Sequence, residues 1–214
     1  MVYPIASKTL LPFVRFFIRK TTGFENISKE GPYIIACKHL ASLDGVFIAA
    51  TIIPIIKQKI HFVSNVAKWG WFWEKIVAEQ WGGLIPFYKK YPHICLNIAQ
   101  EYLKKGEIVG IFPEGILEEK DKLKARAKTG VARLALWSKV PILPISLRYK
   151  NNPKKMEDKM HNRWQAMRNS IINPHSLEIN IGKPFEVSEF YNKKINNDLL
   201  HRTTNMIMDK IESI

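Results

Sequence analysis

Short apolar runs alternate along the chain with longer segments in which apolar residues recur every three or four positions. The first pattern predicts buried strands and the second predicts amphipathic helices. We expect strands at residues 33–37, 61–64, 84–87, 108–112, 142–147 and 177–181, and helices at residues 45–53, 69–79, 94–104, 129–138 and 197–211. Because the two kinds of element alternate, we predict an α/β fold in which helices cover both faces of a mixed, mostly parallel β-sheet.

The N-terminus is predicted as an element of its own. Residues 10–18 suit a short helix whose apolar side chains gather on one side, opposite two arginines. The apolar side holds Leu10, Phe13, Val14 and Phe17. A helix of this kind can lie in a membrane interface, although the pattern also suits a terminal helix packed on the core. We predict an amphipathic membrane-interface helix within residues 1–22 and one further domain in residues 23–214.

The net charge of the chain indicates which classes of partner to expect. It has 33 Lys and Arg against 19 Asp and Glu, a formal net charge of +14, which favours anionic partners such as membrane surfaces, nucleic acid, phosphorylated metabolites or acidic carrier proteins. No apolar run is long enough to predict a spanning helix. Cys37 and Cys95 lack metal-ligand spacing, so we expect reduced thiols, a cytosolic environment and no metal site.

The first candidate chemistry follows the strand at residues 33–37. His39 and Asp44 lie five positions apart, and an ideal helix would separate them by about 140°. We therefore expect His39 in the turn after the strand and Asp44 in the first turn of the next helix, folding back. A carboxylate beside one imidazole nitrogen fixes the tautomer and lets the other nitrogen take a proton from an alcohol. By itself the spacing is weak, since a lone histidine is usually structural.

Three further segments follow in order. They are a glycine-led segment from Gly82 that ends in the cation Lys89, the turn Phe112-Pro113-Glu114-Gly115 after a predicted strand, and the proline-bracketed run Val140-Pro141-Ile142-Leu143-Pro144-Ile145. Together with the His-x4-Asp pair, this ordered set resembles the glycerolipid acyltransferase family that includes the 1-acylglycerol-3-phosphate acyltransferases. The resemblance extends over residues 24 to 190.

The resemblance implies a role for each site residue. His39 would deprotonate the acceptor hydroxyl and Asp44 would orient its imidazole, without a covalent acyl-enzyme. Glu114 and Gly115 would bind the glycerol or phosphate part of the acceptor, and Lys89 would meet the phosphate as a point charge. The acceptor would be a lysophospholipid-type hydroxyl, 1-acylglycerol-3-phosphate first. The donor would be acyl-CoA or an acyl-carrier-protein thioester, and no metal or cofactor is implied.

The chain also departs from the family's pattern. The departures are Lys38 in place of the frequent asparagine, Ala41 in place of serine or threonine, Lys89 in place of arginine, and Ile116-Leu117 in place of threonine-arginine. They weaken the case for lysophosphatidic acid in particular and leave the His-Asp chemistry intact. Four cations soon after the turn could replace the lost one or meet a carrier protein or coenzyme A phosphates: Lys122, Lys124, Arg126 and Lys128.

Other classes of function remain open. A catalytically inactive lipid-binding relative would keep the same motifs, and a basic nucleic-acid-binding protein could stack bases on the tryptophan-rich residues 69–81. Aromatic residues at that density are more often core, so we expect no nucleic-acid partner. A serine hydrolase is disfavoured because no G-x-S-x-G segment occurs. We expect peripheral or monotopic association with the cytoplasmic face of a membrane, where acceptor and product reside.

Overall fold

The computed structural model describes residues 10–40, 43–64, 83–88, 90–114, 127–150 and 177–214. The strands of this part of the chain form one seven-stranded sheet with the order β1-β7-β6-β2-β5-β3-β4. They are β1 (Ile18–Thr22), β2 (Ile34–Cys37), β3 (Ile60–Ser64), β4 (Ile85–Pro86), β5 (Ile108–Ile111), β6 (Ile142–Tyr149) and β7 (Leu177–Ile181). Among these neighbours, β6 and β7 are antiparallel and the other pairs are parallel. The predicted mixed, mostly parallel sheet is confirmed.

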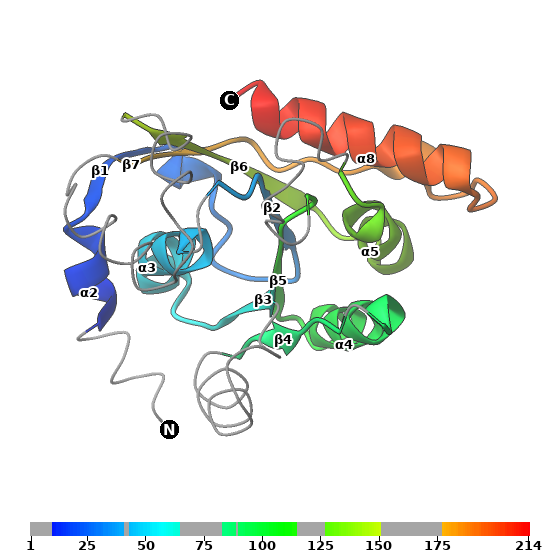
Figure 1. Cartoon of the computed structure of the whole chain (residues 1–214), viewed down its shortest axis with the longest axis horizontal. Coiled ribbons are helices and arrows are strands. Elements are labelled where there is room, and N and C mark those ends of the chain that lie inside the picture. The colour runs from blue at the N-terminus through cyan, green and yellow to red at the C-terminus, as the bar shows by residue number, and fades with distance from the viewer. Residues whose placement is uncertain (1–9, 41–42, 65–82, 89, 115–126, 151–176) are drawn as a thin grey trace.

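Helices cover both faces of this sheet. One side holds α2 (Leu10–Arg15) and α3 (Asp44–Ile56), and the other holds α4 (Pro92–Lys104), α5 (Gly130–Ser138) and α8 (Asn197–Glu212), as Figure 1 shows. Two short 3-10 turns, η1 (Phe24–Asn26) and η3 (Ser188–Phe190), complete the described elements. In β2, Ile34 and Ala36 belong to the core under α4, α5 and α8, whereas Ile35 and Cys37 belong to the core under α3. The side chains of a strand alternate between faces, so one short apolar run fills both cores.

The N-terminal segment differs from the prediction. The helix ends at Arg15, and Ile18–Thr22 forms β1, which pairs in parallel with β7. The Thr22 hydroxyl donates to Asn180 Oδ1 at 2.8 Å and Arg19 pairs with Glu178 at 2.7 Å, both across that pairing. β-branched residues and a partner strand with an open edge favour extended backbone here. Assigning residues 18–22 to a separate N-terminal element was therefore wrong.

The apolar face expected on the N-terminal helix is divided between core and surface. Leu11 is buried and Val14 and Phe17 pack against the core under α3. Phe13 of the predicted face is, in contrast, 61% exposed, and Phe16, which follows α2 and was not part of that face, is 60% exposed. No helix in the described ranges combines the length and apolar character that a membrane span requires.

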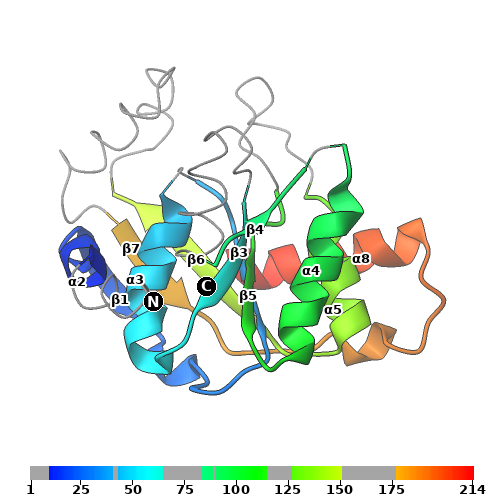
Figure 2. The ribbon, with the colours of Figure 1, turned by 90° about the horizontal axis from the view of Figure 1, so that it is seen from below.

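The sheet has one edge where the site is assembled. The strands β2, β5, β3 and β4 run in the same direction, so their carboxyl ends meet at one edge, and β6 ends there too. The starts of α3 and α4 lie at this edge in Figure 2. Open α/β sheets generally bind ligands outside the carboxyl ends of their strands. The turn after β2 carries His39, and the turn after β5 carries Glu114.

Candidate active site

The structure joins His39 to Asp44 by a hydrogen bond. His39 follows β2 and Asp44 is the first residue of α3. Nδ1–H of His39 donates to Oδ2 of Asp44 at 2.9 Å. A carboxylate can only accept, so the neutral ring carries its proton on Nδ1 and leaves a lone pair on Nε2. Within the described part of the chain Nε2 has no hydrogen-bond partner.

The Asp44 carboxylate is completely buried and is held by further donors. The backbone N–H of Leu40 donates to Oδ2 at 2.6 Å, and the Tyr149 hydroxyl donates to Oδ1 at 2.8 Å. Burial and then the negative charge of Asp44 raise the pKa of Tyr149 well above its ordinary value, so this hydroxyl keeps its proton. A buried carboxylate is costly unless its oxygens accept hydrogen bonds, and here both oxygens do.

Two phenylalanine rings stack in series against one face of the His39 imidazole. The His39 ring lies on the Phe112 ring with centroids 4.3 Å apart, and Phe112 in turn lies against Phe62 at 5.7 Å. Gly110 makes room for this stack, because a Cβ at that position would overlap the Phe62 ring. The side chain of His39 is 17% exposed, so the ring is fixed in place without being sealed in the interior.

Glu114 links the Phe112-Pro113-Glu114-Gly115 turn to the segment that carries His39. Its Oε2 accepts the backbone N–H of His39 at 3.1 Å. Lys38 Nζ lies 3.9 Å from Oε1 of Glu114 and 2.9 Å from Oε1 of Glu212 at the end of α8. Burial raises the pKa of Glu114, although the His39 N–H and the Lys38 charge act in the opposite direction. The structure thus gives Glu114 a hydrogen bond to the backbone of His39, which the sequence analysis did not predict.

Most of the chain matches a known protein family. Residues 18–148 match the family described as Acyltransferase, which is more than half of the chain. The chain belongs to this family. The predicted resemblance to glycerolipid acyltransferases of the 1-acylglycerol-3-phosphate type is thereby confirmed.

Two curated relatives each match about two thirds of the chain. A 1-acyl-sn-glycerol-3-phosphate acyltransferase of Bacillus subtilis is 28% identical over 143 residues, 64% of this chain and 66% of that protein. A chloroplastic 1-acyl-sn-glycerol-3-phosphate acyltransferase of Arabidopsis thaliana is 31% identical over 148 residues, 66% of this chain and 38% of that protein. The matches therefore span less than two thirds of the length of these curated relatives.

A solved structure shares the fold. It is the 1-acyl-sn-glycerophosphate acyltransferase PlsC of Thermotoga maritima, with a TM-score of 0.60 and 18% sequence identity over 99% of this chain and 82% of that one. This likeness shows the acyltransferase-family fold and agrees with the α/β class predicted from the sequence.

Some predicted site residues lie outside the described residues. These are Lys89, Gly115, Ala41, the tryptophan-rich helix predicted at 69–79, and the cations Lys122, Lys124 and Arg126. Lys128 is described, and its backbone N–H donates to Pro113 O at 2.7 Å, which ties Lys128 to the turn that carries Glu114. The roles assigned to Lys89 and Gly115 stay predictions.

His61 has a structural environment. It is buried, with Nδ1 at 2.7 Å from Gly83 O and Nε2 at 2.6 Å from Glu107 Oε2. Its ring stacks on Tyr102 with centroids 3.7 Å apart, so it links β3 to α4. In the described ranges no group of His, Cys, Asp and Glu side chains is placed to hold a metal ion.

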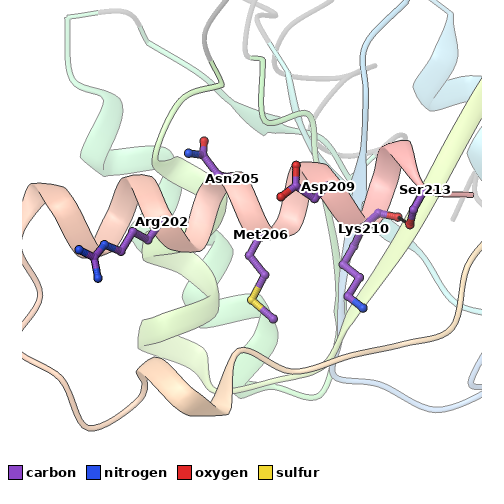
Figure 3. Close-up of a pocket in the computed structure, with 6 residues that line it drawn as sticks. All are labelled: Arg202, Asn205, Met206, Asp209, Lys210 and Ser213. Carbon is purple, nitrogen blue, oxygen red and sulfur yellow. Dashed lines mark hydrogen bonds between the residues drawn. The ribbon is translucent and has the colours of Figure 1, made fainter.

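A shallow groove along α8 is separate from the dyad. Figure 3 shows Arg202, Met206 and Lys210 on one side of the helix, with Asn205 and Asp209 on the other. All the residues that line it come from this one helix. It includes neither His39 nor Glu114, and it plays no part in the chemistry proposed below.

Proposed function

We propose that this member of the acyltransferase family moves a fatty acyl group from an acyl-CoA or acyl-carrier-protein thioester to the hydroxyl of a lysophospholipid-type acceptor, 1-acylglycerol-3-phosphate first, in phospholipid synthesis. One observation carries the proposal. An imidazole whose Nδ1 is held by a buried carboxylate lies at the carboxyl edge of the sheet, and among the described residues its Nε2 has no hydrogen-bond partner. The activity named for the relatives supports the same substrate class.

The reaction requires a base and no covalent intermediate. Nε2 of His39 takes the proton of the acceptor hydroxyl as its oxygen attacks the thioester carbonyl carbon. The attack forms the new C–O bond and gives a tetrahedral intermediate. This intermediate collapses by breaking the C–S bond, and the leaving thiolate takes the proton carried by the imidazolium. Asp44 stabilises that imidazolium and holds the ring through Nδ1.

The acceptor contacts are also part of the proposal. Lys89 would meet the acceptor phosphate, and Gly115 with Glu114 would contact its glycerol part. Glu114 already accepts from the backbone of His39 through Oε2, so we assign its other oxygen, Oε1, to the acceptor side. Lys38, 3.9 Å from that oxygen, would limit the negative charge that an incoming phosphate meets.

The test of the activity is a product assay. The purified chain is incubated with a panel of lysophospholipids and isotope-labelled acyl-CoA or acyl carrier protein, and lipid products are identified by mass. We expect a new acyl ester on 1-acylglycerol-3-phosphate or a related lysolipid, with release of one thiol per ester. Bound lysolipid with an intact thioester would instead identify an inactive lipid-binding relative, and salt-sensitive retention of RNA or DNA alone would favour the nucleic-acid alternative.

Membrane docking through α2 gives a separate prediction. Leu11 anchors α2 on the core while the exposed rings of Phe13 and Phe16 point away from it. Because burying one such side chain contributes about 1.5–3 kcal/mol, the double variant Phe13→Ser and Phe16→Ser should bind anionic vesicles about tenfold or more weakly. Vesicle sedimentation measures the change.

The matched control for docking is Ile195→Ser. Ile195 is 40% exposed and precedes α8, the helix that lies on the other side of the sheet from α2. Its removal should leave vesicle binding unchanged. Equal binding of the double phenylalanine variant and the control would exclude α2 as the docking element.

A further inference from the structure

Tyr149 reaches the dyad from a distant part of the chain. The pairing of β6 with β2 ends at Ile145 opposite Cys37, and β6 continues for four more residues to Tyr149. Side chains of a strand alternate, so Tyr149 lies on the same face as Ile145 and Leu147, the face that packs under α3. The extension of β6 therefore carries the phenol to the first residue of α3. Tyr149 also lies just past residues 18–148, which match the family.

Three hydrogen bonds that Asp44 accepts from described residues divide between its two oxygens. Oδ2 accepts from His39 Nδ1 and from the Leu40 N–H. Oδ1 accepts from Tyr149 at 2.8 Å. With two donors on one oxygen, the plane of the carboxylate could still tilt about its bond to Cβ. A donor on the second oxygen fixes that plane, and with it the direction in which Asp44 holds the imidazole.

We propose that Tyr149 is a positioning residue, whose hydroxyl orients the Asp44 carboxylate so that Asp44 can hold His39 as the base. This role rests on the proposed acyl transfer. The other ionisable groups around the dyad in the described residues are Cys37, Lys38 and Glu114. None of them donates to Oδ1 of Asp44 in a hydrogen bond that the structure shows.

Removing the hydroxyl tests this role. In Tyr149→Phe we expect kcat to fall about 10- to 100-fold, the effect of losing one hydrogen bond to a charged buried group, with KM nearly unchanged. The acid limb of the kcat/KM profile should also move to higher pH, because a carboxylate that loses a donor makes protonation of the coupled pair easier. A merely structural tyrosine would lower stability and leave that limb in place.

Tyr33→Phe is the matched control. Tyr33 is also buried in the core under α3, and its hydroxyl donates to the backbone oxygen of Ser28 at 3.3 Å, away from the dyad. We expect this variant to keep the wild-type kcat and pH profile. An equal change in both variants would attribute the effect to the core and overturn the positioning role.

A second variant should keep the fold and move the acid limb of the pH profile in the opposite direction. Replacing Tyr149 with 3,5-difluorotyrosine retains the ring and strengthens its hydroxyl as a donor, so the acid limb should move to lower pH. In an Asp44→Asn background, Tyr149→Phe should have little further effect on kcat, since both changes act through the same carboxylate. Independent, additive losses would overturn the proposal, and the difluorotyrosine variant decides the matter if Tyr149→Phe folds poorly.

The outcomes separate this role from the proposed function. An active wild-type chain with unchanged kcat and acid limb in Tyr149→Phe overturns the positioning role and leaves the acyl transfer standing. A wild-type chain without acyl transfer overturns the proposed function instead. In that case ¹⁵N NMR of His39 still tests the contact, because Tyr149→Phe should alter the Nδ1–H signal, and an unchanged signal would refute it.

Discussion

Replacement of His39 with alanine is expected to lower kcat for acyl transfer by about 10²- to 10⁴-fold, the usual contribution of a general base. The fold should survive, because the ring is partly exposed and its main packing contact is one face of Phe112. Initial rates on the purified variant measure the first effect, and thermal unfolding followed by circular dichroism measures the second.

His201→Ala is the control for that experiment. His201 lies on α8, and it is not assigned to the site. It should keep full activity, which would show that acyl transfer depends on His39 and is not lost when another histidine is removed. Turnover retained in pure His39→Ala protein would contradict the assignment of this residue as the base and, with it, the mechanism.

Gly110→Ala is expected to have the largest effect among substitutions that do not touch the dyad. The new Cβ would overlap the Phe62 ring, and both β5 and Phe62 are buried. Overpacking of this kind costs about 1–3 kcal/mol of unfolding free energy. Since Phe62 supports Phe112 and Phe112 supports His39, a displaced ring should also lower kcat. Denaturant unfolding and initial rates test both effects.

Gly45→Ala is the control that tests whether steric overlap causes the destabilisation expected in Gly110→Ala. A Cβ on Gly45 would meet the Phe112 and Phe62 rings at 3.8 Å, an ordinary contact. Gly45 lies within α3, where alanine is favoured over glycine by about 0.5–1 kcal/mol. We therefore expect this variant to be as stable as the wild-type chain or more so. Equal destabilisation of the two variants would mean that steric overlap with Phe62 is not the reason.

The hydrogen bond between His39 and Asp44 could be predicted because it is local. Both residues lie within one strand-turn-helix segment, so periodicity and helix geometry restrict where each can sit. The same argument explains why most strands and helices were placed within a few residues. The strand β1 was missed because its partner, β7, lies more than 150 residues later in the chain, and local pattern carries no information on that pairing.

Tyr149 and Phe62 were missed for a related reason. The hydrogen bond from Tyr149 to Asp44 spans 105 positions and depends on how far β6 extends beyond β2. In the sequence, Tyr149 ends a segment in which apolar and polar residues alternate, and it shows no sign of a functional role. Its alternation with Ile145 and Leu147 was a usable signal, since it places all three on one face, but the identity of the neighbouring helix came only from the fold.

The order of strands also limits how the chain can be shortened. β7 lies between β1 and β6, yet it begins at Leu177, well past the end of the family match at residue 148. A recombinant piece cut to the matched residues would hold β1 with nothing to bridge it to the rest of the sheet, and it would lack Glu212, the ion-pair partner of Lys38. The smallest autonomous folding unit therefore has to extend through α8, and homology borders are a poor guide for truncating this enzyme family member.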